Sequence, residues 1–343
     1  MPTIKDVAGL AGVSTATVSR VLNNHQQISP ETRARVTAAV ERLDYQFNRV
    51  ARRLRMEGAQ ILGLIISDIA NPFFTSVVRG IEDVAYENQY SLLLCNSDEH
   101  PAREELHMRV LLAEKVAGVI ISPTDENSVV YKPLIKSGTP VVLLDRRLRH
   151  IDLDTVIVDN IQGAYDAVDH LIRLGHRRIG LIGGPMRITT ARERQEGYAK
   201  ALRDHGLTVA EALIKGGDFK QDSGYRAAHE LLALDDPPTA IFTANNLMTL
   251  GALNAIHETG LRIPTDVAIV GFDDMPWAQS LDPPLTTISQ PTCDMGRTAA
   301  NLLLKRIAGG HTDTVEIKLP ATLIDRKSCG LHVGKEVQAL AAV

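Results

Sequence analysis

The side chains best suited to chemistry in this 343-residue chain are polar and aromatic residues that follow short apolar runs. Carboxylates and amides accept hydrogen bonds from hydroxyls, arginine donates in pairs from a planar fork, and aromatic rings cover flat C–H faces. Together they suit a ligand with a rim of hydroxyls, such as a monosaccharide. The candidates are Asn71, Phe73, Phe74, Asp145, Arg146, Phe219, Asn245, Asp273, Gln290 and an arginine of the segment T-A-R-E-R at 190–194.

These candidates are expected at the edge of a parallel sheet. From about residue 61, apolar runs such as I-L-G-L-I-I-S, V-A-G-V-I-I-S and V-A-I-V-G-F-D alternate with helical stretches, which is typical of parallel strands covered on both faces. Ligands of such open sheets bind beyond the carboxyl ends of the strands. Eight or more runs are too many for one sheet of this kind. The helix from about 161 is therefore interpreted as the start of a second lobe.

Each candidate also has a simpler explanation. Asp145 and Asp273 are the residue type that caps helices, and Phe73 or Phe74 taken alone is typical of a core. An enzyme on this fold would need a nucleophile, a phosphate loop or a metal cluster. The segment R-I-G-L-I-G-G-P lacks the G-x-G-x-x-G spacing, and the eleven histidines are scattered. We therefore expect no catalytic residues, no metal and no cofactor, although carboxylates in a cleft leave hydrolysis open as an alternative.

The first residues indicate a second activity. Residues 4–23 predict two short helices around a Gly-Val-Ser corner, where Gly12 permits the turn and Ser14 caps the second helix. The residues expected to pack inward are Ile4, Val7, Ala8 and Leu10, then Val18, Val21 and Leu22. Thr15, Ala16, Thr17, Ser19 and Arg20 are left facing outward. A helix-turn-helix presents such residues to base edges and phosphates in a DNA groove.

Charge and further helices support a nucleic-acid-binding head. Residues 31–43 predict a third helix that closes a small core through Val36, Ala39, Val40 and Leu43. The first 60 residues hold nine Lys or Arg against five Asp or Glu, whereas the remainder holds 28 against 36. Four of the arginines lie within 49–55, in the segment Y-Q-F-N-R-V-A-R-R-L-R at 45–55. A basic head on an acidic body is consistent with phosphate contact by the head alone.

These motifs closely resemble the LacI/GalR family of transcriptional regulators, from the first residues to about residue 330. The resemblance implies an all-α helix-turn-helix headpiece at 1–46 and a hinge helix and linker at 47–60. It also implies an α/β body at 61–330, built like periplasmic sugar-binding proteins from two Rossmann-like lobes. The lobes would comprise about 61–159 with 291–320 and about 161–288 with 323–330, joined by three crossovers. Residues 331–343 form a tail without a family counterpart.

The resemblance also assigns roles. The cleft candidates match the binding set of ribose-responsive members, which selects Arg194 in T-A-R-E-R, with Arg192 as the alternative, and implies ribose or a related pentose as effector. Thr15, Ala16 and Arg20 match base-reading positions, and Arg20 is expected to contact guanine. Thr17, Ser19 and Asn23 match phosphate contacts, and Asn48, Leu54 and Arg55 lie in the DNA-contacting hinge segment. Leu54 would wedge between base pairs of the minor groove. Phe47 departs from the family pattern and leaves the entry to the hinge helix open.

A two-fold homodimer is expected, dimerised through the first lobe and reading a palindromic operator on double-stranded DNA. Tetramer formation stays open. We expect the sugar to release the repressor, with a corepressor or a phosphoprotein partner as alternatives. A sugar-binding protein of the periplasmic type without a DNA role would have no need of the basic head. Three widely spaced cysteines, and no signal or membrane-spanning run, favour a cytoplasmic protein.

Overall fold

The computed structural model describes residues 2–22, 28–44, 60–310 and 313–330. The chain divides into two compact units, residues 1–59 and 60–343, referred to here as the headpiece and the body. The predictions for Asn23, Asn48, Leu54 and Arg55, and for the tail at 331–343, concern residues outside the described ranges. No described helix is long and apolar enough to cross a bilayer.

The headpiece contains three helices, α1 (Ile4–Ala11), α2 (Thr15–Leu22) and α3 (Pro30–Arg42). Gly12 adopts a left-handed conformation with φ 62°, which lets α1 end and the chain turn. The Ser14 hydroxyl accepts a hydrogen bond from the Thr17 amide at 3.1 Å and so caps α2. Val7, Val18 and Val36, one from each helix, are fully buried and form the centre of the small core.

One expected core residue of the headpiece is wrong. Leu10 is 44% exposed, and Ala11 is buried in its place. The reason is helical periodicity, since Val7 and Ala11 are one helical turn apart whereas Leu10 lies around the side of α1. Arg35 on α3 completes the turn by donating to the carbonyls of Ala11 at 2.6 Å and Gly12 at 3.1 Å.

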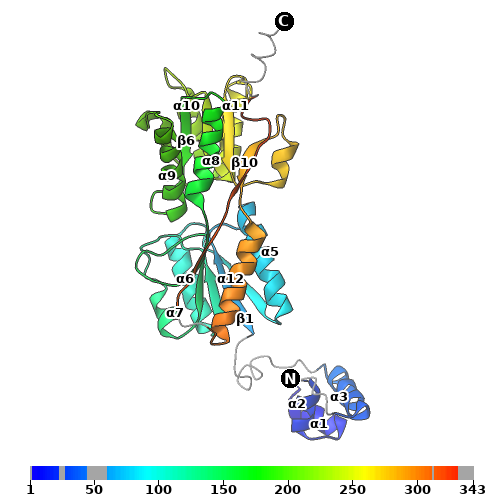
Figure 1. Ribbon diagram of the computed structural model, residues 1–343. Coiled ribbons are helices and arrows are strands. Elements are labelled where there is room, and N and C mark those ends of the chain that lie inside the picture. Colours follow the sequence, from blue (N-terminus) through cyan, green and yellow to red (C-terminus); the bar gives the residue numbers. More distant parts are fainter. Residues whose placement is uncertain (1, 23–27, 45–59, 311–312, 331–343) are drawn as a thin grey trace. The chain divides into compact units, whose positions relative to one another are not determined.

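The body contains two six-stranded sheets, which define an N-lobe and a C-lobe (Figure 1). The N-lobe strands, in spatial order, are β11 (Glu316–Leu319), β5 (Asp154–Val158), β4 (Val141–Leu144), β3 (Gly118–Ile121), β1 (Ile61–Ile66) and β2 (Ser91–Asn96). The C-lobe strands are β12 (Thr322–Ile324), β10 (Thr286–Ser289), β9 (Ala268–Phe272), β8 (Ala240–Thr243), β6 (Ile179–Gly183) and β7 (Ile214–Gly216). All pairings are parallel except β10 with β12. The predicted two-lobe α/β architecture is confirmed.

Helices cover both sheets (Figure 1). The N-lobe helices are α5 (Pro72–Glu87), α6 (Pro101–Ala113), α7 (Lys132–Lys136) and α12 (Thr292–Ile307). The C-lobe helices are α8 (Asn160–Arg173), α9 (Thr189–Asp204), α10 (Gln221–Leu232) and α11 (Asn246–Glu258), with short 3₁₀ turns at η1 (Glu211–Leu213) and η2 (Pro276–Ser280). Glycines let paired helices approach closely, since a Cβ on Gly296 of α12 would lie 2.2 Å from the Val77 carbonyl oxygen of α5.

The chain passes between the lobes three times. β5 leads into α8, β10 leads into α12, and β11 leads into β12. β11 and β5 are the two strands at one end of the N-lobe sheet, and β12 and β10 are the two at one end of the C-lobe sheet. The hinge between the lobes therefore lies at these ends of the sheets. The strands at the other end, β2 and β7, are the outer strands farthest from the crossovers.

Candidate functional site

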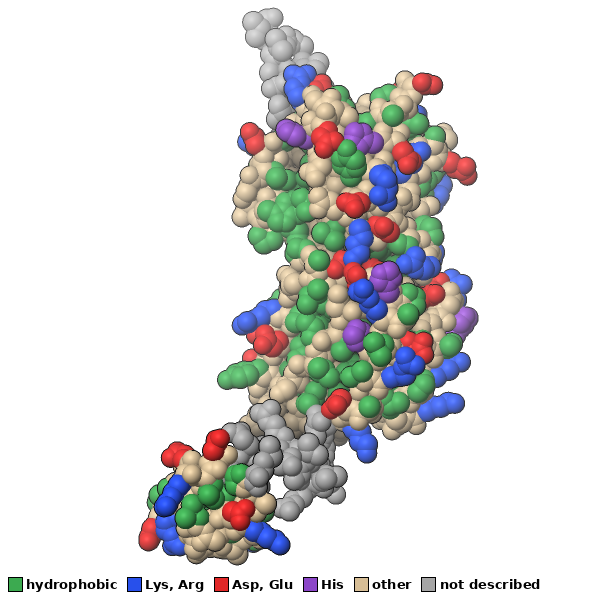
Figure 2. Space-filling view, turned by 180° about the vertical axis from the view of Figure 1, so that it is seen from behind, with side chains coloured by type: hydrophobic (Ala, Val, Ile, Leu, Met, Phe, Trp, Pro, Cys, Tyr) green, Lys and Arg blue, Asp and Glu red, His purple; other side chains and the backbone are tan. Residues whose placement is uncertain are grey.

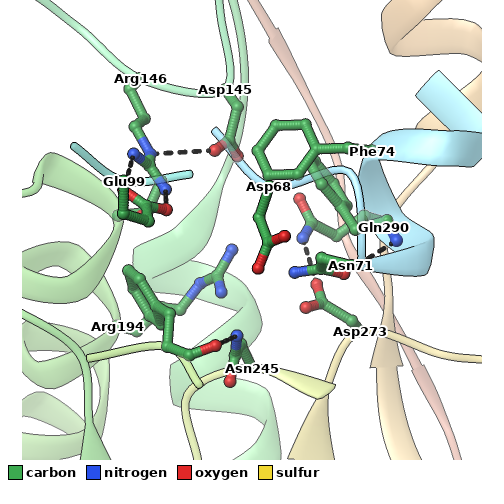
Figure 3. Close-up of a pocket in the computed structure, with 13 residues that line it drawn as sticks. Asp68, Asn71, Phe74, Glu99, Asp145, Arg146, Arg194, Asn245, Asp273 and Gln290 are labelled. Atoms are coloured by element: carbon green, nitrogen blue, oxygen red, sulfur yellow. Dashed lines mark hydrogen bonds and ion pairs between the residues drawn. The ribbon is translucent and has the colours of Figure 1, made fainter. Parts of the chain in front are cut away.

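A cleft between the lobes collects the predicted effector residues (Figure 3). The side chains around it enclose about 380 Å³, open solvent at the mouth included. They are Asp68, Asn71, Phe73, Phe74, Glu99, Asp145, Arg146, Thr190, Arg194, Phe219, Asn245, Asp273 and Gln290. All ten predicted residues are in this set, because the carboxyl ends of the strands of both sheets face the cleft.

Three phenylalanines supply the apolar part of the cleft. Phe73 and Phe74 begin α5 and form an edge-to-face pair with ring centroids 4.9 Å apart and planes at 84°. Phe219 follows β7, and its ring packs so closely on Gly184 that a Cβ there would lie 2.3 Å from it. All three rings are at least nine-tenths buried, so the apolar surfaces are in place before a ligand arrives.

Arg146 is held in a fixed orientation. Its Nη1 and Nη2 donate to the two carboxylate oxygens of Glu99 at 2.8 and 2.6 Å, and its Nε lies 3.4 Å from Asp145 Oδ2. The guanidinium lies 6.0 Å from the centroid of the Phe219 ring. Burial would lower the pKa of Arg146, but Glu99 and Asp145 raise it overall. The group is therefore a permanent cation.

Arg194 is anchored within the C-lobe. Its Nε donates to Asn160 Oδ1 at 2.9 Å, its Nη1 donates to the Ala244 carbonyl at 2.6 Å, and its guanidinium stacks 3.7 Å from the centroid of Phe272. Arg192, the alternative in T-A-R-E-R, instead donates to Glu126 and to the Met186 carbonyl and does not line the cleft. The geometry favours Arg194 as the ligand-facing residue.

The amides both shape the cleft and connect its walls. Asn71 caps α5 through the Phe73 amide, and Asn245 caps α11 through the Met248 amide, each at 2.9 Å. Asn246 Nδ2 donates across the cleft to Asn71 Oδ1 at 2.8 Å. Gln290, at a crossover, donates to the Asp273 carboxylate.

The two central carboxylates differ from ordinary aspartates. Burial raises the pKa of Asp145 to about 6, with Asp273 and Glu99 adding to the effect and Arg146 and Arg194 opposing it. Burial also raises the pKa of Asp273, against the influence of Arg194 and Gln290. The helix-cap explanation is partly right for Asp273, whose Oδ2 accepts from the first amide of α11, at Asn246, at 3.3 Å.

Backbone strain is concentrated around the cleft. Asp145, Phe219 and Asp273 have φ of 67°, 66° and 77°, and Asp98 and Glu99 at its rim have φ of 52° and 59°. A left-handed conformation at a residue other than glycine is unfavourable by about 1 kcal/mol or more. Such strain persists where the surrounding structure imposes it, typically at binding sites.

Two buried polar atoms of the cleft lack a hydrogen-bond partner among the described residues. They are the acceptor Gln290 Oε1 and the donor Arg146 Nε, whose 3.4 Å ion-pair contact with Asp145 is not a hydrogen bond. An unmet buried donor or acceptor is unfavourable by about 1–3 kcal/mol, so a ligand hydroxyl that satisfies one gains binding free energy.

The sequence reasoning missed three cleft residues, Asp68, Glu99 and Thr190. Asp68 lies two positions after the end of β1, and Glu99 lies three positions after the end of β2. Inspecting the residues that follow each strand would therefore have found both. Thr190 opens the quoted T-A-R-E-R segment. Its selection needed the conformation of α9, which the sequence pattern does not give.

The predicted DNA-contacting residues within the described headpiece lie on α2. Thr15, Ala16 and Arg20 are exposed, whereas Thr17 and Ser19 are half-buried. The Thr17 hydroxyl is already 2.9 Å from the Ser14 hydroxyl, as part of the cap. A phosphate contact by Thr17 would therefore share that hydroxyl with the cap.

Comparisons with known proteins place both the helical headpiece and the α/β body in known families. The family described as "Bacterial regulatory proteins, lacI family" matches residues 3–48, and "Periplasmic binding protein-like domain" matches residues 168–329. The "HTH-type transcriptional repressor PurR" of Aliivibrio salmonicida is 36% identical over 329 residues, 96% of this chain and 99% of that repressor. The chain belongs to the LacI family of transcriptional repressors.

Solved structures of the family are similar to most or nearly all of this chain. The lac repressor dimer bound to operator and the anti-inducer ONPF is 32% identical, with a TM-score of 0.85 and coverage of 96% and 99% of the two chains. A complex of the regulator CelR with cellobiose is 35% identical, with TM-score 0.74 and coverage of 96% and 100%. A LacI-family regulator of Enterococcus faecium with bound ribose is 32% identical, with TM-score 0.72 and coverage of 79% and 98%.

Proposed function

We propose that this LacI-family repressor is controlled by a neutral monosaccharide, with ribose or a related pentose as the first choice. The observation that carries the proposal is the composition of the cleft, which combines four carboxylates, two arginines, three amides and three phenyl rings. Every hydroxyl of a sugar both donates and accepts, so a dense ring of both group types suits it.

A planar heterocycle fits the same cleft less well. Such a ligand is bound best between parallel aromatic faces, but Phe73 and Phe74 are nearly perpendicular. It would also offer fewer donors and acceptors than a sugar to the polar side chains of the cleft, and a buried group left without a partner is unfavourable.

An anionic ligand is disfavoured by charge. Lys220 already pairs with Asp68, and Arg146 pairs with both Glu99 and Asp145, so the four carboxylates that line the cleft outnumber its two arginines. A phosphate or carboxylate would add negative charge to a buried site that holds an excess of acidic groups. The proposed effector is therefore unphosphorylated.

For DNA, we propose that α2 reads the major groove through Thr15, Ala16 and Arg20, and that Asn23, Asn48, Leu54 and Arg55 extend the contact as the family resemblance implies. The exposed position of the three α2 residues supports this assignment. Two copies related by a two-fold axis would read inverted half-sites of a palindromic operator.

The N-lobe edge supports a homodimer. Leu94 on the outer strand β2, with Leu106 and Val110 on α6, are 36%, 51% and 42% exposed. An exposed outer strand with apolar neighbours is typical of a surface that another chain covers. Analytical ultracentrifugation of Leu106→Asp is expected to show a monomer where the unchanged protein is a dimer.

A thermal-shift screen tests the effector directly, because a ligand that binds only the folded state raises the melting temperature with concentration. The screen should contain D-ribose, other pentoses, D-glucose, cellobiose, a pentose phosphate and a purine base. We expect a shift with a pentose, its loss in Asp273→Asn, and an unchanged shift in Asp266→Asn, an exposed aspartate that pairs with Arg262 within the C-lobe. A shift with the purine base or the sugar phosphate alone would contradict the proposal.

A further inference from the structure

Lys220, next to a cleft residue, connects the two lobes. Lys220 Nζ, in the C-lobe, lies 2.6 Å from Asp68 Oδ2 and 2.7 Å from Asp98 Oδ1, both in the N-lobe. Asp68 lines the cleft with a side chain only 7% exposed, and Lys220 directly follows the cleft residue Phe219. The contact therefore ties one wall of the ligand site to the other.

This contact lies far from the hinge. Asp98 follows β2 and Lys220 follows β7, which are the outer strands of their sheets. The three crossovers lie at the opposite ends of the strand orders, around β5, β10, β11 and β12. When two lobes rotate about a hinge, the edge farthest from it separates most. An attraction at this edge therefore acts with the longest lever arm against opening.

Two further ion pairs cross between the lobes nearer the middle of the sheets. Arg147, after β4, pairs with Glu193 of α9, and Glu126, after β3, pairs with Arg192 of α9. Arg147 also binds Glu316 within its own lobe. Charged side chains of both signs gather where the lobes meet (Figure 2). Among these pairs, only the Lys220 contact includes a residue that lines the cleft.

The backbone around Lys220 is held in place on both sides. Phe219 before it and Asp98 opposite it both have a left-handed φ. The neighbouring Glu99, also left-handed, is fixed by Arg146. The Lys220 contact therefore joins two loops that each carry a cleft residue, Phe219 in the C-lobe and Glu99 in the N-lobe.

We propose that Lys220 is a positioning residue for the effector, which clasps the closed cleft by binding Asp68 and Asp98. The inference rests on the proposed effector function of the cleft. Lys220 need not touch the ligand to act. It sets how long the lobes stay closed, and hence how slowly the effector dissociates and how strongly it controls the operator.

The test compares Lys220→Gln with Lys215→Gln, a control that removes an equal charge from β7, where Lys215 pairs 3.6 Å away with Glu230 inside the C-lobe. The dissociation rate of D-ribose from full-length protein is measured at low and high salt. Lys220→Gln is expected to release ribose about tenfold faster, the value for losing a charge-assisted hydrogen bond. The release rate of this variant should also depend less on salt. In the unchanged protein, salt screens the partly exposed pair of Lys220 and Asp98, and the variant lacks that pair.

Lys220→Arg should restore slow release and the salt dependence, whereas Lys215→Gln should match the unchanged protein. A merely structural role would lower the melting temperature without changing the salt dependence of release. Equal dissociation rates for Lys220→Gln and Lys215→Gln would overturn the proposal.

Hydrogen exchange without ligand separates this inference from the proposed function. Peptides covering 97–100 and 218–223 contain the two loops that Lys220 joins. The Glu99 amide donates to the Ser67 carbonyl at 2.9 Å and the Asp218 amide to the Ser223 hydroxyl at 3.0 Å, so their exchange reports how firmly each loop is held. Both are expected to exchange faster in Lys220→Gln than in Lys215→Gln. If no monosaccharide binds the unchanged protein, the proposed function fails, and this exchange comparison still decides whether Lys220 clasps the lobes.

Discussion

The two binding regions of this repressor are prepared in opposite ways. On α2, the residues assigned to base contact are exposed. In the cleft, almost every assigned side chain is buried and already bonded to a neighbour, such as Arg146 to Glu99. The headpiece therefore presents exposed side chains to DNA. The body instead fixes its polar groups before the ligand arrives.

This difference predicts which substitutions affect stability as well as binding. A preorganised site loses little rotamer freedom when it binds a ligand, but each of its groups also holds the fold. Truncating an exposed α2 side chain should change DNA binding alone. Truncating a cleft residue should change both ligand binding and folding.

The largest effect is expected for Arg146→Ala. The substitution leaves Glu99 and Asp145 buried without their cation, so the free energy of unfolding of the body should fall by about 3–5 kcal/mol. Urea unfolding without ligand measures this. Arg103→Ala is the control, because that arginine pairs with Asp98 but is 55% exposed, and its loss should change stability by less than about 1 kcal/mol. Equal effects would show that the cleft is not preorganised.

A glycine from each unit, Gly296 of the body and Gly9 of the headpiece, allows helix packing in the two units to be compared. Gly296→Ala places a Cβ 2.2 Å from a backbone oxygen of α5, so α5 and α12 must separate, and a loss of about 1–3 kcal/mol is expected. Gly9 on α1 has nothing within 4 Å of its ideal Cβ. Gly9→Ala should be neutral or stabilise the headpiece by up to about 1 kcal/mol. Thermal unfolding of the two variants measures the difference in stability. Destabilisation of the headpiece by Gly9→Ala would contradict the open space around Gly9.

On α2, Arg20→Ala should weaken operator binding by about 1–3 kcal/mol and leave unfolding unchanged within about 0.5 kcal/mol. Fluorescence anisotropy with specific and scrambled duplexes measures the loss. Arg42→Ala removes an exposed charge from α3 and should affect both duplexes alike. If Arg20→Ala weakened binding to both duplexes equally, Arg20 would contact a phosphate and not a base, which would contradict the proposal.

The smallest effect concerns pH. The pKa of Asp145 is raised to about 6, so the ligand-free fold favours its protonated form. Asp145 therefore contributes to folding stability at low pH, and this contribution is lost as pH rises through about 6. Sugar hydroxyls donate to the ionised form, so sugar affinity should rise by up to about tenfold between about pH 5 and pH 7, with a proton released on binding. Isothermal titration at several pH values measures this. Asp145→Asn should flatten the profile, and an affinity that falls with pH would contradict the assignment.

The sequence predicted the parts of the fold with strong patterns. Long apolar runs such as β1 and β9 are covered on both faces, and their residue types show it. The strands that the apolar runs did not reveal are short or polar, namely β7, β10, β11 and β12. β12 pairs antiparallel at the hinge, where three residues are too few for a pattern.

The cleft was predictable for a different reason. Parallel strands bring their carboxyl ends to one edge, so residues as distant as Asn71 and Gln290 share a site once the strands are recognised. Lys220 could not be found this way. Its partners, Asp68 and Asp98, belong to the other lobe, and no local pattern records a contact across a cleft.

The central claim is that sugar in the cleft and operator on the headpiece are coupled. The most direct measurement is operator affinity by fluorescence anisotropy at increasing D-ribose, paired with ribose affinity in the presence and absence of operator. Thermodynamic linkage requires equal factors in the two experiments. The account predicts that ribose weakens operator binding and that operator weakens ribose binding by the same factor. Operator binding that ribose leaves unchanged or tightens would contradict it.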